Sequence, residues 1–349
     1  MKKNNYLILI TLLIMITLTS FIKKVYEPEY TVRVTSIKEI SKTGKEYQLL
    51  IISQTTNLGM PNIQLNTDTI YTSLSFNDGL FTKIPSDFED KIISFHLPKG
   101  YMVVFAENSD GTGESACFVA VKTDVNANLP KRLRNNISYI RYIAINNPGK
   151  KGAANIKDAP VNALNATWFY GWSLNRNSFT NQQFVPMTWG KTSCTDGYAK
   201  YLINRKDVDH LLSFNEPDGK GQSNIQDFDT AIARYKIMMK TGFRLGSPAT
   251  TQDQAFRDGR WLPQFIEKAN KEKVRVDYIA VHWYDWGNEK NNKETDELTA
   301  EAIFKRFVGY MEKLHATYPV KTIWLTEFNA NVKRTSEAVH EKFMLLATD

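Results

Sequence analysis

The spacing of apolar and polar residues divides the chain into two regions of different character. Between residues 30 and 128 the apolar residues fall in short runs separated by turn signals, without helical spacing. Pro98-Lys99-Gly100 and the glycine-rich segment 107–113 each join two runs as in a hairpin. Short strands at this spacing predict a β-sandwich over residues 30–128. The clearest expected strands are 30–34, 47–52, 92–97, 101–105 and 116–121.

From residue 150 to residue 349, strand-like runs alternate with helical patterns, which is typical of βαβ units and a parallel sheet. The expected strands are 152–156, 167–172, 184–189, 211–216, 245–249, 278–284 and 322–327. The expected helices are 225–239 after a capping box at 223–226, then 261–269, 299–317 and one that follows Ser336. Residues 129–149 are interpreted as a linker that contains one boundary strand at 137–145.

Polar or aromatic residues close most of the predicted strands of the second region. The apolar run 211–214 ends in Asn215-Glu216-Pro217, and Pro217 cannot continue a strand ladder. In a parallel α/β barrel this end of the strands faces the active site. The other strand-end residues are Trp172, Trp189, Ser247, His282, Tyr284 and Glu327. Two glutamates at such ends can lie across the barrel mouth from each other, where one can protonate a glycosidic oxygen.

Composition and charge add mainly exclusions. The chain of 349 residues carries a net charge of +7 spread over many lysines, so nucleic-acid binding is unsupported. Cys117 and Cys194 are far apart, which argues against a disulfide framework. Asp218, Asp285 and Glu289 lack metal-ligand spacing, so neither a metal nor a cofactor is expected.

The first 24 residues have the pattern of an export segment. Lys2 and Lys3 precede an apolar run over residues 6–22, and Lys23 and Lys24 follow it. The segment is either a cleaved signal peptide or an uncleaved membrane anchor, and both variants predict a secreted or cell-envelope protein.

The second region resembles clan A glycoside hydrolases, and closely resembles glycoside hydrolase family 128. The resemblance spans about residues 150–335 and is carried by five stretches in the family's order: FVPMTWG at 184–190, SFNEPD at 213–218, LGSPA at 245–249, VHWY at 281–284 and WLTEF at 324–328. It implies a (β/α)8 TIM-type barrel after the all-β domain, and endo-acting hydrolysis of β-1,3-glucan with retention. It also implies Glu216 as general acid/base and Glu327 as nucleophile.

The remaining site residues are assigned to substrate contacts. Asn215 is expected to hold the sugar 2-hydroxyl, and His282 and Tyr284 alternate onto one face where either can hydrogen-bond Glu327. A purely structural His282 is an equal alternative. Trp172, Trp189 and Trp286 are candidates for stacking on sugar rings of a β-glucan polysaccharide or oligosaccharide, with core packing as an even alternative for Trp172.

Three questions stay open in the sequence. The first region can be a carbohydrate-binding module or a stabilising domain. The activity can belong to another clan A β-glycanase, or the protein can be a non-catalytic glucan-binding or adhesion protein. The chain ends at Asp349 inside the predicted seventh helix, without the eighth strand that the family pattern expects. We therefore expect a fragment with unpaired first and seventh strands, low stability and weak activity, unless residues 137–145 close the barrel.

Overall fold

The computed structural model describes residues 49–73, 80–146, 149–154, 164, 166–179, 181–285, 293–330 and 335–348. The predicted export segment at 1–24, the predicted strand at 30–34 and Trp286 lie outside these residues. Among the helices that are described, none combines the length and the apolar character needed to cross a bilayer.

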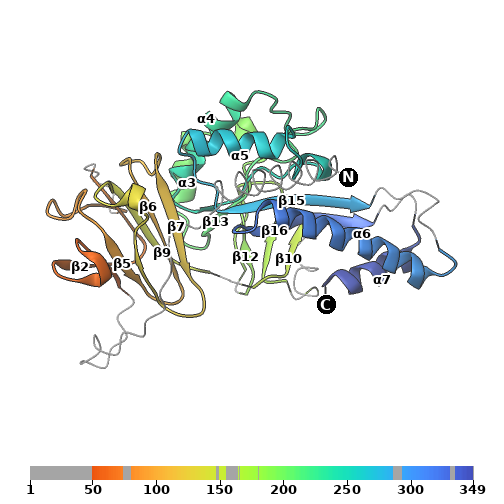
Figure 1. Ribbon diagram of the computed structural model, residues 1–349, viewed down its shortest axis with the longest axis horizontal. Helices are drawn as coiled ribbons and strands as arrows, with labels where there is room; N and C mark the ends of the chain where they lie inside the picture. Colours follow the sequence, from red (N-terminus) through yellow and green to blue (C-terminus); the bar gives the residue numbers. More distant parts are fainter. Residues whose placement is uncertain are drawn as a thin grey trace, which may run out of the picture.

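Two mainly antiparallel sheets pack face to face in the N-terminal half, at the left of Figure 1. The first has the order β2-β1-β5-β8, with β1 Leu50–Ser53, β2 Asn62–Leu65, β5 Ser94–Leu97 and β8 Val125–Asn128. The second has the order β4-β3-β9-β6-β7, with β3 Thr69–Thr72, β4 Phe81–Lys83, β6 Tyr101–Ala106, β7 Ser115–Ala120 and β9 Tyr139–Ala144. Between them Phe95 packs against Phe105 and Phe118, with ring centroids 5.2 and 4.6 Å away.

Strand β9 confirms the strand expected at 137–145, but it belongs to the sandwich itself rather than to a linker. It lies in the middle of the second sheet and pairs antiparallel with both β3 and β6. Ile140 and Tyr142 face the sandwich core, whereas Tyr139 and Ile143 face the other half of the molecule. A strand that is buried on both faces loses the polar alternation that would mark its sheet. Because β9 pairs with strands of the sandwich, the expectation that this segment could close the barrel is wrong.

The C-terminal half contains parallel strands that follow one another in sequence order. They are β10 Gly152–Ala154, β11 Trp168–Tyr170, β12 Gln183–Phe184, β13 His210–Leu211, β14 Arg244–Leu245, β15 Tyr278–Asp285 and β16 Thr322–Ala330. Parallel pairing joins β10 to β11 to β12, β13 to β14, and β15 to β16. Isolated parallel bridges, such as Met187 to Leu212 and Gly246 to Tyr278, connect these groups. All seven strands expected from the sequence are present; β10 to β14 are shorter than expected, whereas β15 and β16 extend beyond the expected ends.

A closed barrel is not found in the described part of the chain, so the expected (β/α)8 barrel is seen only as a mixed α/β fold. There, β10 pairs with β11 alone and β16 with β15 alone. The sheet nevertheless curves, since Tyr170 of β11 donates a hydrogen bond to the backbone oxygen of Thr326 in β16 at 3.1 Å. The rings of Trp168 and Trp324 lie 4.7 Å apart across the same interior. Side chains from alternate strand positions thus fill the space that the sheet encloses.

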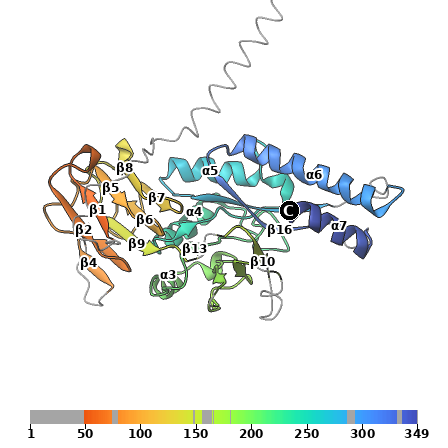
Figure 2. The same cartoon turned by 90° about the horizontal axis from the view of Figure 1, so that it is seen from below.

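Helices cover the outside of these strands (Figure 1). They are α3 Asp196–Ile203, α4 Phe228–Met239, α5 Trp261–Lys271, α6 Asp296–Thr317 and α7 Glu337–Thr348. Short 3-10 turns are η1 Thr56–Leu58, η2 Lys131–Leu133, η3 Lys191–Ser193 and η4 Gln252–Gln254. Helix α3 was not expected, and α4 begins later than the capping box at 223–226 predicted. Asp227 caps α4 instead, because its carboxylate accepts from the backbone N–H of Asp229 and Thr230. Figure 2 shows α6 and α7 together at the end farthest from the sandwich.

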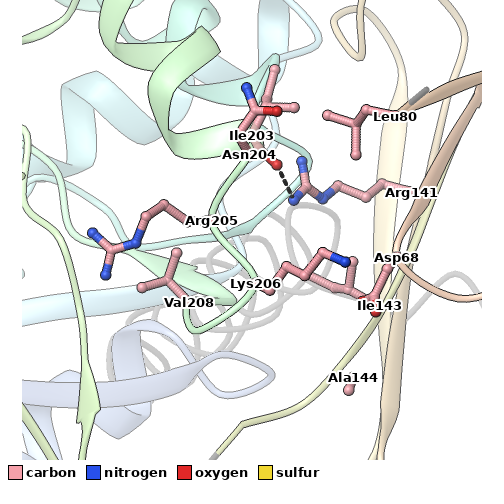
Figure 3. Close-up of a pocket in the computed structure, with 10 residues that line it drawn as sticks. All are labelled: Asp68, Leu80, Arg141, Ile143, Ala144, Ile203, Asn204, Arg205, Lys206 and Val208. Carbon is pink, nitrogen blue, oxygen red and sulfur yellow. Dashed lines mark hydrogen bonds between the residues drawn. The ribbon is translucent and has the colours of Figure 1, made fainter. Parts of the chain in front are cut away.

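The sandwich is docked against the parallel-strand half by a continuous apolar core. That core runs from Met102 and Ile143 in the second sheet to Met239 and Phe243. Arg141 of β9 crosses the junction and donates to the backbone oxygens of Thr241 at 2.7 Å and Ile203 at 3.0 Å, the latter drawn in Figure 3. Residues 241–243 directly precede β14, so the junction lies at the N-terminal ends of the strands.

Candidate active site

The two glutamates predicted at strand ends lie on either side of one histidine ring. Glu216 follows β13, Glu327 lies in β16, and His282 lies between them in β15. Nδ1 of His282 is 3.0 Å from Oε1 of Glu216, and Nε2 is 3.4 Å from Oε1 of Glu327. The side chains of Glu216 and Glu327 are 16% and 13% exposed, whereas His282 is 1% exposed. Both carboxyl groups can therefore meet a substrate, and the buried ring keeps them close together.

Glu327 is surrounded by neutral hydrogen-bond donors. Tyr284 Oη donates to Oε2 at 2.7 Å, and Trp172 Nε1 and Tyr170 Oη donate to Oε1 at 2.9 and 3.1 Å. Burial, followed by the neighbouring Glu327, raises the pKa of both Tyr170 and Tyr284 above the usual phenol value. Both phenols therefore stay protonated donors across the ordinary pH range. Converging neutral donors stabilise an ionised carboxylate, which is the form that a nucleophile needs.

Glu216 has a different environment. Its carboxyl group contacts His282, and its backbone adopts a left-handed conformation with φ of 40°. Two backbone hydrogen bonds hold Glu216 in this turn. The N–H of Glu216 donates to the oxygen of Ala249 at 2.7 Å, and the N–H of Gly219 donates to the oxygen of Glu216 at 2.9 Å. Trp172 also has a positive φ, of 49°. Non-glycine residues in this region cost about 1–2 kcal/mol and concentrate at functional sites.

Asn215 is buried beside Glu216 and is held by the loop that follows. Its Nδ2 donates to Oε1 of Gln222 at 3.1 Å. Its Oδ1 is buried and has no hydrogen-bond partner among the described residues. A substrate hydroxyl is one group that could satisfy this oxygen.

The predicted tryptophans are placed differently from one another. Trp172 points its indole N–H at Glu327 and packs edge-on against Tyr170, with centroids 5.5 Å apart. Trp189 is half-buried and packs against the apolar side chains inside the curved sheet, and its backbone oxygen accepts from the N–H of Asn215. Trp286 lies outside the described residues. Trp283 faces away from the site, between Phe307 and Phe343.

Tyr170 was missed in the sequence, although alternation along 168–172 places it on the same face as Trp172.

The acidic residues near the rim have other partners. Asp218 accepts from the hydroxyl of Thr251 at 2.5 Å, and Asp285 forms a bidentate pair with Arg306 at 2.8 Å. Within the part of the chain that is described, no group of histidine, cysteine and acidic residues is arranged to hold a metal ion. The small pocket drawn in Figure 3 lies at the domain junction and shares no residue with this site.

Comparison with known proteins gives the class. A family model described as glycosyl hydrolase catalytic core matches residues 143–348, which is more than half of the chain. The chain belongs to this family, and the prediction of a glycoside hydrolase is confirmed. No curated protein matches significantly.

Several solved structures of family 128 endo-beta-1,3-glucanases are similar to this chain. For a subgroup I enzyme from Amycolatopsis mediterranei, in complex with laminaripentaose, the sequence identity is 28%, the match covers 57% of this chain and 82% of that enzyme, and the TM-score is 0.48. For a subgroup II enzyme from Sorangium cellulosum, the identity is 22%, the match covers 56% of this chain and 80% of that enzyme, and the TM-score is 0.42. For a subgroup IV enzyme from Lentinula edodes, the identity is 18%, the match covers 57% of this chain and 77% of that enzyme, and the TM-score is 0.44.

Proposed function

We propose that this protein is a retaining endo-β-1,3-glucanase of glycoside hydrolase family 128. Glu216 is the general acid/base and Glu327 the nucleophile. The observation that carries the proposal is the unequal surroundings of two carboxyl groups that share one histidine. Three neutral donors converge on Glu327, whereas His282 is the one hydrogen-bond partner of the Glu216 carboxyl group among the described residues. Environments that differ in this way suit two carboxyl groups for different roles in one reaction.

The reaction would take two steps at these carboxyl groups. In the first, an oxygen of Glu327 attacks the anomeric carbon while Glu216 gives its proton to the departing glycosidic oxygen. The glycosidic bond breaks and a covalent glycosyl-enzyme forms. In the second step, Glu216 takes a proton from water, which attacks the anomeric carbon and releases Glu327 as a carboxylate. Two inversions at that carbon give a product with the original configuration.

The donors around Glu327 would fix the attacking oxygen. Tyr284 holds Oε2, and Trp172 with Tyr170 holds Oε1, so the carboxylate is restrained at both oxygens. A positioned nucleophile loses less freedom on the way to the transition state. His282 would keep the two glutamates at a constant separation, because its buried ring contacts both.

The β-1,3-glucan substrate is supported by the five sequence stretches that resemble family 128, of which SFNEPD contains Glu216 and WLTEF contains Glu327. Asn215 is proposed to bind the 2-hydroxyl of the sugar, and Trp189 and Trp286 to stack on sugar rings. The parallel strands in sequence order support assignment of the C-terminal half to the (β/α)8 type. We further propose export to the cell envelope or medium through residues 1–24, with or without retention as a membrane anchor.

Purified protein incubated with laminarin, cellulose, xylan and mixed-linkage glucan tests the function. Release of short oligosaccharides from laminarin, with a rapid fall in polymer length, is the expected result for an endo-acting β-1,3-glucanase. Cleavage of a different polymer would identify another clan A β-glycanase. Retention on a laminarin affinity gel without hydrolysis would identify a glucan-binding protein. N-terminal sequencing of the protein from envelope and medium fractions tests export.

A further inference from the structure

The amide group of Asn215 has one end occupied and one end open. Nδ2 donates to Oε1 of Gln222 at 3.1 Å, which commits the N–H end of the amide to that contact. Oδ1 is thereby fixed as the remaining end, and it is buried without a partner in the described residues. Only 4% of Asn215 is exposed, so bulk water does not readily satisfy this oxygen. A buried carbonyl oxygen of this kind favours a ligand that can donate a hydrogen bond.

Gln222 is held in place by the loop between Glu216 and α4. Its backbone N–H donates to the oxygen of Gly219 at 3.0 Å, and the N–H of Gly219 donates to the oxygen of Glu216 at 2.9 Å. A Cβ atom on Gly219 would lie 3.3 Å from Cγ of Gln222 and 3.3 Å from the Glu216 oxygen, so glycine permits this close packing. The loop therefore ties Gln222 to the backbone of the proposed acid/base.

The loop is also tied to Asn215 itself. The backbone N–H of Ser223, the residue after Gln222, donates to the Asn215 oxygen at 3.2 Å. Gly190 makes room for this approach, since a Cβ atom there would lie 3.3 Å from Cβ of Ser223. Gln222 thus reaches the Asn215 amide from a fixed backbone, which is the condition for setting an amide's orientation.

We propose that Gln222 is a positioning residue that orients the amide of Asn215 so that Oδ1 accepts a hydrogen bond from a sugar hydroxyl. The assignment rests on the proposed function and names a further specificity element of the same site. An acceptor at this place selects for a sugar whose 2-substituent can donate a hydrogen bond. It disfavours a sugar in which hydrogen replaces that hydroxyl. A purely structural role would make Gln222 equally important for both sugars.

The test compares two substrates and a set of variants. The substrates are an aryl β-laminaribioside and its analogue without the 2-hydroxyl on the sugar next to the aryl group. Gln222→Ala removes the acceptor, Gln222→Asn shortens it with little change in polarity, and Gln222→Glu keeps an acceptor at the same reach. Gln226→Ala is the matched control, because Gln226 lies in the same loop and donates to the oxygens of Pro217 and Asp218 rather than to Asn215.

On the substrate with the hydroxyl, Gln222→Ala and Gln222→Asn should each lower kcat/KM about tenfold, the size of one hydrogen bond, and Gln222→Glu should restore most of it. On the analogue, all three should match the wild type within about twofold. The effect of Gln226→Ala should be the same on both substrates. Thermal melting of each variant separates misfolding from loss of rate.

Equal losses on both substrates, or no loss with Gln222→Ala, would overturn the assignment of Gln222 while leaving the proposed function intact. The wild type is measured first on the substrate with the hydroxyl. If it fails to cleave that substrate, the proposed function is rejected, and the role of Gln222 falls with it.

Discussion

Replacement of Tyr284 by phenylalanine tests whether the donors around Glu327 stabilise the carboxyl group that is proposed to attack. The change removes one hydroxyl, whose oxygen lies 2.7 Å from Oε2 of Glu327, and leaves the ring in place. Hydrogen bonds to charged groups contribute about 1.5–3 kcal/mol. Tyr170 and Trp172 still donate to the other oxygen, and Glu327 is 13% exposed, so the lower half of that range applies.

A loss of about 1.4 kcal/mol of transition-state stabilisation corresponds to about a tenfold fall in kcat/KM. Tyr284 donates to the carboxyl group that is proposed to attack, so its removal leaves that group less well positioned and less stabilised, and kcat/KM should fall about tenfold. Tyr284 stays protonated across the ordinary pH range because burial and Glu327 raise its pKa, so its hydroxyl is present as a donor throughout the assay.

The assay is kcat/KM on laminarin oligosaccharides for Tyr284→Phe and for a control, Tyr235→Phe. Tyr235 also loses a buried hydroxyl, but this one donates to the backbone oxygen of Gly246 at 2.8 Å. The control should keep the wild-type kcat/KM. A kcat/KM in Tyr284→Phe that equals the wild-type value would refute the view that these donors stabilise the attacking carboxyl group.

Three further predictions concern the reacting groups and the domain junction. Glu216→Gln and Glu327→Gln should each lower turnover of laminarin by several orders of magnitude while the melting temperature stays near that of the wild type; near-normal turnover in either would reject the assignment. Proton NMR of the first products should show the β anomer before mutarotation, and an initial α anomer would indicate inversion. Arg141→Met should destabilise the protein by about 2–4 kcal/mol, because it removes two charged hydrogen bonds across the junction. Chemical denaturation measures this loss. An unchanged denaturation curve in the variant, or two separate transitions in the wild type, would contradict the view that the two halves unfold as one unit.

The strand ends of the C-terminal half were accessible to sequence reasoning because each strand has a short-range signal. Pro217 ends the strand before it, and alternation along β15 places His282 and Tyr284 on one side and Trp283 on the other. These signals depend on neighbouring residues only. The structure places His282 and Tyr284 against Glu327, and it places Trp283 against Phe307 and Phe343.

Contacts between distant segments could not be predicted in the same way. Strand β9 is covered on both faces, by the sandwich core and by the C-terminal half, so its sequence gave no sign of the sheet to which it belongs. Helix α3 has only Ala199 and Leu202 buried and exposes Tyr198 and Tyr201, which obscures its apolar face. The contact between Gln222 and Asn215 depends on loop geometry, which leaves no periodic pattern.

The junction bears on the role of the sandwich, which the sequence left open. Its second sheet shares an apolar core with the C-terminal half, and Arg141 donates to two backbone oxygens on the far side of the junction. A module tethered by a linker would bury far less surface. The sandwich therefore covers the N-terminal ends of the parallel strands, the side of such a fold that is associated with stability and lies opposite the catalytic side.

Covalent trapping of the nucleophile tests the central assignment most directly. The protein would be incubated with a 2-deoxy-2-fluoro-β-laminaribiosyl fluoride, digested and analysed by peptide mass spectrometry. The two-glutamate account predicts one added disaccharide on the peptide that contains Glu327, and no label on the Glu327→Gln variant. A label on Glu216, or complete turnover of the fluoride to an α product without a covalent adduct, would contradict it.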